Sequence, residues 1–171
     1  MTTDLIFDPT HPVDDRYRPP ACGELDEIAG LMADGRLSGG APVLAAYEQA
    51  LTTWFGTARA VAVNSGSSAL HATLAALDVK PGSEVLVPAT APLPTAMPIL
   101  TRGATPVIVD TLPNSLAMDP CDVERKLTSR TRAAIVLPLW GYPNNDHQTT
   151  TLLAAAGVPV VEDACQAHTA R

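Results

Sequence analysis

Two short segments carry groups that could bind a small phosphorylated ligand. The first, residues 64–71, joins an apolar run to a helical pattern and includes Gly66, Ser67 and Ser68. Free backbone N–H groups at a helix N-terminus, with hydroxyls nearby and a glycine that permits close approach, form a phosphate-binding site. A plain serine N-cap explains the segment equally well when it is taken alone. It is neither GxGxxG nor a P-loop, so it does not indicate a dinucleotide or nucleoside triphosphate.

The second segment, residues 160–168, ends an apolar run with an acidic pair. Asp163 is the second of that pair, and Gln166 and His168 follow it. A carboxylate at the end of a buried strand needs a cationic partner, because an unpaired charge in a low-dielectric site is costly. A pyridinium nitrogen would satisfy this need. The alternative is a carboxylate that only caps the next turn.

The elements that must position these segments follow a regular alternation from residue 60 onward. Short apolar runs rich in β-branched residues alternate with helical patterns and turns. The predicted strands are 60–64, 84–88, 106–110, 133–138 and 158–163, and the predicted helices are 67–77, 95–102, 119–127 and 147–156. The runs lack polar alternation, which indicates burial on both faces and therefore a mainly parallel α/β sheet with helices on both faces. Ligands of such sheets bind beyond the carboxyl ends of the strands.

The chain before residue 60 has a different character. Residues 8–20 hold four prolines, so residues 1–20 are expected to form an extended arm rather than part of a core. Helical spacing predicts helices over 24–33 and 42–55. Residues 21–171 are expected to form the N-terminal portion of one larger domain.

Composition excludes several classes of protein. The 171 residues carry 18 acidic and 11 basic side chains, a net charge of -7, which argues against nucleic acid as a partner. No apolar run is long enough to span a membrane. The N-terminus lacks a secretory signal, and the three cysteines form no cluster, so a cytoplasmic protein without a metal site is expected.

Taken together, the segments resemble the DegT/StrS family of sugar aminotransferases, which depend on pyridoxal phosphate (PLP) and have the aspartate-aminotransferase fold. The resemblance covers about residues 24–170. It is carried, in the family's order, by residues 36–40, 47–48, 63–71, 81–89, 103–110, 139–141 and 161–168. The combination of the serine-rich loop with Glu-Asp-Ala-Cys-Gln-Ala-His is the most specific part.

The resemblance implies roles for the residues of both segments. Gly66, Ser67 and Ser68 would hold the cofactor phosphate. Asp163 would pair with the pyridine nitrogen and keep the ring protonated as an electron sink. Gln166 would lie near the phenolic oxygen. His168 would contact the substrate or the cofactor.

Two departures from the family's pattern affect the expected activity. The family's Schiff-base lysine follows the Glu-Asp-Ala-x-Gln segment by some tens of residues, and this chain ends at Arg171. Its two lysines, Lys80 and Lys126, each precede a predicted strand, so we expect both at the amino end of the sheet and no catalytic residue in this chain. Pro92 stands where the family has an aromatic residue that stacks on the ring. Pro98 should make the helix around it short, kinked or displaced.

These features predict one subunit of a split PLP-dependent aminotransferase that acts on a keto-sugar, a cyclitol or a related carbonyl compound. PLP would be shared with a second polypeptide that brings the lysine and the C-terminal domain, in a dimer of heterodimers. The fold would be incomplete without that partner, because an open sheet edge and uncovered apolar faces mark interaction surfaces. The alternative is a non-catalytic scaffold for a full-length relative. An artificially shortened chain and a lysine-free PLP enzyme also stay open.

Overall fold

The computed structural model describes residues 21–142 and 147–168. The chain divides into two compact units, Met1–Ala62 and Val63–Arg171. The predicted arm, residues 1–20, lies outside the described residues.

The first unit contains two helices with the predicted bounds, α1 (Glu24–Ala33) and α2 (Pro42–Phe55). Proline at the first position of α2 is preorganised for a helix start, and α2 ends at Gly56, whose φ of 64° suits a glycine. Neither helix has a buried residue. Large apolar side chains of both helices are exposed: Leu25, Ile28, Met32, Val43, Tyr47, Trp54 and Phe55.

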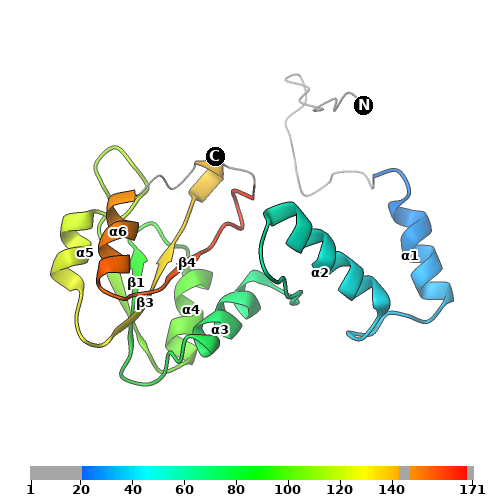
Figure 1. The fold of residues 1–171 in the computed structure, drawn as a ribbon, viewed down its shortest axis with the longest axis horizontal. Helices are drawn as coiled ribbons and strands as arrows, with labels where there is room; N and C mark the ends of the chain where they lie inside the picture. The colour runs from blue at the N-terminus through cyan, green and yellow to red at the C-terminus, as the bar shows by residue number, and fades with distance from the viewer. Residues whose placement is uncertain (1–20, 143–146, 169–171) are drawn as a thin grey trace. The chain divides into compact units, whose positions relative to one another are not determined.

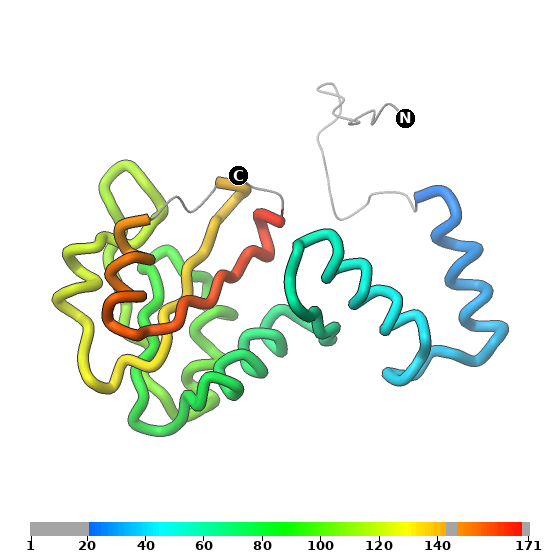
Figure 2. Tube along the Cα trace, in the orientation of Figure 1, coloured from blue at the N-terminus to red at the C-terminus, as the bar shows by residue number. Residues whose placement is uncertain are grey.

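The second unit is built on a four-stranded sheet, and its strands are β1 (Glu84–Pro88), β2 (Thr105–Val109), β3 (Thr131–Val136) and β4 (Val160–Glu162). The strand order is β2-β1-β3-β4. Every pairing is parallel. Figure 2 shows β4 running alongside β3 at one edge of the sheet. The predicted parallel α/β sheet is confirmed.

Helices cover both faces of this sheet (Figure 1). They are α3 (Gly66–Ala76), α4 (Leu93–Thr101), α5 (Pro120–Lys126) and α6 (His147–Ala155). Alternate strand residues point to opposite faces, so Val85, Val87 and Ile135 pack in one core with α3 and α4. Leu86 and Val136 pack in the other core with α5 and α6. The sheet therefore separates two helical layers.

One predicted strand is wrong. Residues 60–64 are not a strand in the structure, and Val61 and Val63 are 77% and 45% exposed. A strand exists only through hydrogen bonds to a neighbour, and none of the four strands pairs with this segment. The β-branched composition of residues 60–64 is typical of a strand, but composition does not determine whether a neighbouring strand is available for pairing.

The helix bounds agree with the predictions to within two residues. Pro98 lies inside α4, which has nine residues, so the predicted short helix is observed. The strand predicted over 133–138 ends earlier, and a 3-10 turn, η2 (Leu139–Gly141), follows it. Trp140 within this turn has a φ of 54°, which a non-glycine residue rarely adopts. In the part of the chain that the structure describes, no helix is long and apolar enough to cross a membrane.

Candidate cofactor site

The candidate site is built around Asp163, which follows β4 at the carboxyl edge of the sheet. Its N–H donates to the carbonyl of Val136 at 2.9 Å and extends the β3–β4 ladder by one bond. The carboxylate accepts hydrogen bonds from two residues, Thr95 and Cys165. The Thr95 hydroxyl donates to Oδ2 at 3.1 Å. The N–H of Cys165 donates to Oδ1 at 3.4 Å. The backbone and two neutral donors therefore hold this carboxylate in place.

The serine-rich segment forms the N-terminus of α3, as predicted. Ser65 is the N-cap, and its hydroxyl oxygen accepts from the Ser68 N–H at 3.2 Å. The Ser65 hydroxyl in turn donates to Oγ of Ser68 at 2.9 Å. Within the described residues, no acceptor is seen for the N–H groups of Gly66 and Ser67. Both the N-cap interpretation and the anion-site interpretation are consistent with this geometry, since the cap uses only one of the N-terminal N–H groups.

Cys165 connects this helix terminus to Asp163. A Cβ atom at Gly66 would lie 3.2 Å from Sγ of Cys165, so a glycine permits the close approach. The thiol hydrogen bond to Asp163 raises the pKa of Cys165, and partial burial adds to the rise. Residues from the two sequence segments, almost 100 positions apart, therefore meet at one place. The convergence expected at the carboxyl edge is observed.

Gln166 is held by the unusual turn after β3. The N–H of Trp140 donates to Oε1 of Gln166 at 3.0 Å. This bond fixes the carboxamide with its oxygen toward the backbone, so the Nε2 group is left to donate elsewhere. Among the described residues no partner for Nε2 is seen.

His168 lies at the surface, and the structure does not bring it into contact with the other candidate residues. It is exposed in the turn after Cys165, and no hydrogen bond of its side chain is seen within the described residues. An open groove of about 330 Å³ lies beside Ser67 and Ser68, lined also by Met97 and Thr101. His71, at the same groove, lies 3.3 Å from the Thr101 hydroxyl.

The charges at the site fit PLP. No lysine, arginine or histidine of the described residues forms an ion pair with Asp163, so its carboxylate can accept from a cationic ring nitrogen. The unused N–H groups at the start of α3 and the hydroxyls of Ser67 and Ser68 match a phosphate. In the loop after β1, at the same edge of the sheet, Oγ1 of Thr90 is buried and has no hydrogen-bond partner among residues 21–142 and 147–168. The donors and acceptors present therefore suit a ligand with a cation at one end and an anion at the other.

The two lysines lie away from this site, although one is not where the sequence predicts. Lys80 precedes β1 and pairs with Asp78 at 2.8 Å, at the predicted amino end. Lys126 does not stay at the amino end, because its side chain folds back along α5. Its ammonium group donates to the carbonyl of Ile108, near the carboxyl end of β2, at 2.7 Å.

Lys126 is nevertheless remote from Asp163. It belongs to the layer of α5, on the opposite face of the sheet from α3 and α4. Strands β2 and β4 are at opposite edges, and three strand spacings of about 4.8 Å amount to about 14 Å. Neither lysine can reach a ligand that contacts both Asp163 and α3.

Pro92, which the resemblance puts at or near the stacking position, is the N-cap of α4, with φ -67° and ψ 153°. No aromatic residue occurs in the whole segment 89–98. This connection therefore offers no aromatic ring to a ligand at the site.

Sequence reasoning missed one contributor to the site. Thr95 is 1% exposed and contacts Asp163 across 68 positions of sequence. A threonine in the first turn of a helix that leaves a central strand was the only sequence signal for it. Trp140 follows a predicted strand and was therefore expected at this edge of the sheet, where it contributes its backbone N–H while its side chain is 72% exposed.

Curated proteins with sequences similar to this chain include two aminotransferases. The chain is 38% identical over 144 residues to dTDP-3-amino-3,4,6-trideoxy-alpha-D-glucose transaminase of Streptomyces venezuelae, an alignment that covers 84% of this chain and 38% of the relative. It is 31% identical over 178 residues to L-glutamine:2-deoxy-scyllo-inosose aminotransferase of Streptomyces paromomycinus, covering 98% of this chain and 42% of the relative.

A solved structure gives the same result. The crystal structure of NtdA from Bacillus subtilis with bound cofactor PMP superimposes with a TM-score of 0.80 and 28% identity, over 84% of this chain and 33% of that one. The chain thus spans about two fifths or less of the length of these relatives. The profile of the DegT/DnrJ/EryC1/StrS aminotransferase family matches residues 22–171. The chain belongs to the DegT/DnrJ/EryC1/StrS aminotransferase family.

Proposed function

We propose that this chain contributes the cofactor-binding half of a PLP-dependent aminotransferase whose amino acceptor is a keto-sugar, a keto-cyclitol or a related carbonyl compound. The observation that carries the proposal is the Asp163 carboxylate, which lies beside the N-terminus of α3 and has neutral donors and no cationic partner among the described residues. The acceptor class is taken from relatives whose names include a trideoxyglucose transaminase and a scyllo-inosose aminotransferase.

Each residue would do one task toward the cofactor. The N–H groups of Gly66 and Ser67, with the serine hydroxyls, bind the phosphate. Asp163 would accept a hydrogen bond from the protonated ring nitrogen and stabilise its positive charge. When bound, PLP supplies an electron sink for the carbon that exchanges the amino group. Gln166, fixed by Trp140, donates its free N–H to the phenolic oxygen.

His168 is proposed to contact the substrate. It is exposed, it follows Asp163 by five residues, and no hydrogen bond between its imidazole and another described residue is seen. An imidazole can donate or accept a hydrogen bond near neutral pH, which suits a ligand rich in hydroxyls.

The lysine that binds PLP is proposed to come from a second polypeptide. Two observations support this: Lys80 and Lys126 lie away from Asp163, and both helices of the first unit leave their apolar side chains exposed. Obligate interfaces are large and apolar. A dimer of such pairs would form the complete enzyme.

One experiment tests the origin of the lysine. The tagged chain is isolated from its native cells with whatever polypeptide accompanies it, PLP is added, and the complex is reduced with borohydride and mapped by mass spectrometry. We expect the adduct on a lysine of the second polypeptide. A stoichiometric adduct on Lys80 or Lys126 would contradict the proposal, and a Lys80→Arg/Lys126→Arg variant of the chain, which should leave the labelling unchanged, is the matched control.

A second candidate function is a non-catalytic scaffold for a full-length relative. The absence of an aromatic residue from segment 89–98, with Pro92 at the stacking position, favours it. The two functions differ in one respect. In a scaffold complex, substitution of Asp163 would leave the partner's turnover unchanged, whereas in a shared site it would not.

A further inference from the structure

The contact between Thr95 and Asp163 joins two parts of the chain that local structure does not require to meet. Thr95 is in the first turn of α4, is 1% exposed, and donates to Oδ2 of Asp163 at 3.1 Å. A buried hydroxyl that donates to an ionised carboxylate forms a charge-assisted hydrogen bond, stronger than a bond between neutral groups.

Three other helical threonines of this chain use their hydroxyls locally. Thr52 and Thr73 donate to the backbone carbonyl four residues earlier, and Thr101 donates to the carbonyl three residues earlier. Such bonds satisfy the hydroxyl locally and need no distant partner. Thr149 in α6 has a distant acceptor, but that acceptor is a backbone carbonyl, of Met118, at 3.3 Å. Thr95 instead donates to a carboxylate from another element.

Among the described residues, Cys165 is the other residue that contacts the carboxylate, through its N–H and its thiol. Its N–H contacts Oδ1 at 3.4 Å, which is long for a hydrogen bond. The torsion about the Cβ–Cγ bond of an aspartate is broad, so weak contacts leave the carboxylate free to rotate. Thr95 gives the shorter of these two hydrogen bonds, and it holds the carboxylate from a separate element, whereas Cys165 is only two residues away along the chain.

We propose that Thr95 is a positioning residue, which holds the Asp163 carboxylate in the orientation that accepts the ring nitrogen of the cofactor. This inference rests on the proposed function. Thr95 needs no contact with the cofactor itself, because it acts through the aspartate. Removal of the Thr95 hydroxyl leaves the negative charge of Asp163 at the site, but the orientation of the carboxylate is then no longer fixed.

The test measures the affinity of pyridoxamine 5′-phosphate (PMP), which binds without a lysine, for the isolated complex by equilibrium dialysis. Thr95→Val keeps the shape and removes the donor, and we expect it to weaken PMP binding by about 5- to 30-fold. Thr95→Ser keeps the donor and should stay within roughly twofold of the unmodified protein. Thr95→Ala is a second hydroxyl deletion, used if Thr95→Val does not fold by circular dichroism.

A double-mutant cycle separates positioning from direct contact. In an Asp163→Ala background, Thr95→Val should change PMP affinity by less than roughly twofold, because the residue through which Thr95 acts is absent. An equal loss in both backgrounds would overturn the positioning role. Undiminished binding by Thr95→Val would overturn this inference alone, whereas failure of the unmodified complex to bind PMP would overturn the proposed function and this inference with it.

Discussion

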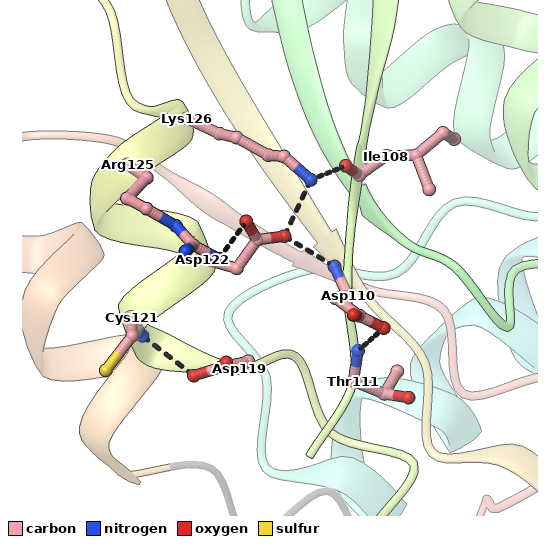
Figure 3. A network of polar contacts seen from close by, with 8 residues as sticks. All are labelled: Ile108, Asp110, Thr111, Asp119, Cys121, Asp122, Arg125 and Lys126. Atoms are coloured by element: carbon pink, nitrogen blue, oxygen red, sulfur yellow. Dashed lines mark hydrogen bonds and ion pairs between the residues drawn. The ribbon is translucent and has the colours of Figure 1, made fainter. Parts of the chain in front are cut away.

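Two aspartates, Asp163 and Asp122, lie on opposite faces of the sheet and have opposite surroundings. Asp122 in α5 is almost fully buried and has ionic partners on both of its oxygens (Figure 3). Lys126 donates to its Oδ2 at 2.6 Å and Arg125 to its Oδ1 at 2.9 Å. The N–H of Asp110 also donates to Oδ2, at 2.7 Å. Asp163, by contrast, has neutral donors only in the part of the chain that the structure describes.

The difference distinguishes a structural carboxylate from a ligand-binding one. The hydrogen bond from the Asp110 backbone, followed by that from Lys126, lowers the pKa of Asp122 to about 2. Its charge is fully compensated within the chain, and it ties α5 to the end of β2. Asp163 retains capacity for a cation, which is the condition for binding a pyridinium.

The largest expected effect follows from substitution of Asp163. Asp163→Asn preserves volume, so we expect the complex to assemble, but turnover should fall by ~100-fold or more because the ring nitrogen loses its charged partner. Steady-state transamination by the isolated complex measures this. Asp122→Asn is the matched control and should retain turnover at a permissive temperature. Wild-type rates with Asp163→Asn would favour the scaffold function.

The contrast between the two aspartates also shows what a sequence can predict. The bounds of helices 24–33 and 42–55 were predicted approximately from apolar spacing and agree with the structure, because such spacing is a local signal. The alternation of apolar runs and helices likewise gave the parallel sheet. The segment after β4 and the N-terminus of α3 were placed at one edge by topology alone.

The errors concern interactions between distant parts of the chain. Residues 60–64 have the composition of a strand, but strand formation depends on a neighbour that no local pattern specifies. The Thr95 contact spans 68 positions. The side chain of Lys126 was misplaced because its partners, Asp122 and the carbonyl of Ile108, determine its direction. Long flexible side chains follow their partners rather than the position of their Cα atoms.

A smaller effect, on stability rather than activity, is expected at Asp122. Asp122→Asn removes a buried negative charge that pairs with Arg125 and Lys126, so the melting temperature at pH 6 should fall, measured by circular dichroism. Asp78→Asn is the control, because Asp78 pairs with Lys80 at an exposed position where ion pairs contribute little. An equal loss in both variants would contradict the distinction between the buried and exposed pairs.

The same variant has a predicted pH dependence. The folded-state pKa of Asp122, about 2, is below the ordinary value of 3.8. The stabilisation is therefore complete above about pH 4, and it is lost as the pH falls toward 2, because the unfolded chain takes up the proton first. The difference in melting temperature between wild type and Asp122→Asn should shrink over this interval. A difference that stays constant down to pH 2 would contradict the assignment.

The smallest expected effect is on the reactivity of Cys165, which reports on Asp163 without any cofactor. The hydrogen bond to the Asp163 carboxylate raises the pKa of the thiol and so reduces the fraction of reactive thiolate at neutral pH. Asp163→Asn removes the negative charge, and iodoacetamide should then alkylate Cys165 faster by roughly two- to fivefold. Mass spectrometry of the modified peptide gives the rate, with Cys121 in the same sample as the internal control. Equal acceleration at Cys121 would indicate general loosening of the chain, whereas acceleration confined to Cys165 would establish that the Asp163 carboxylate and this thiol interact in solution.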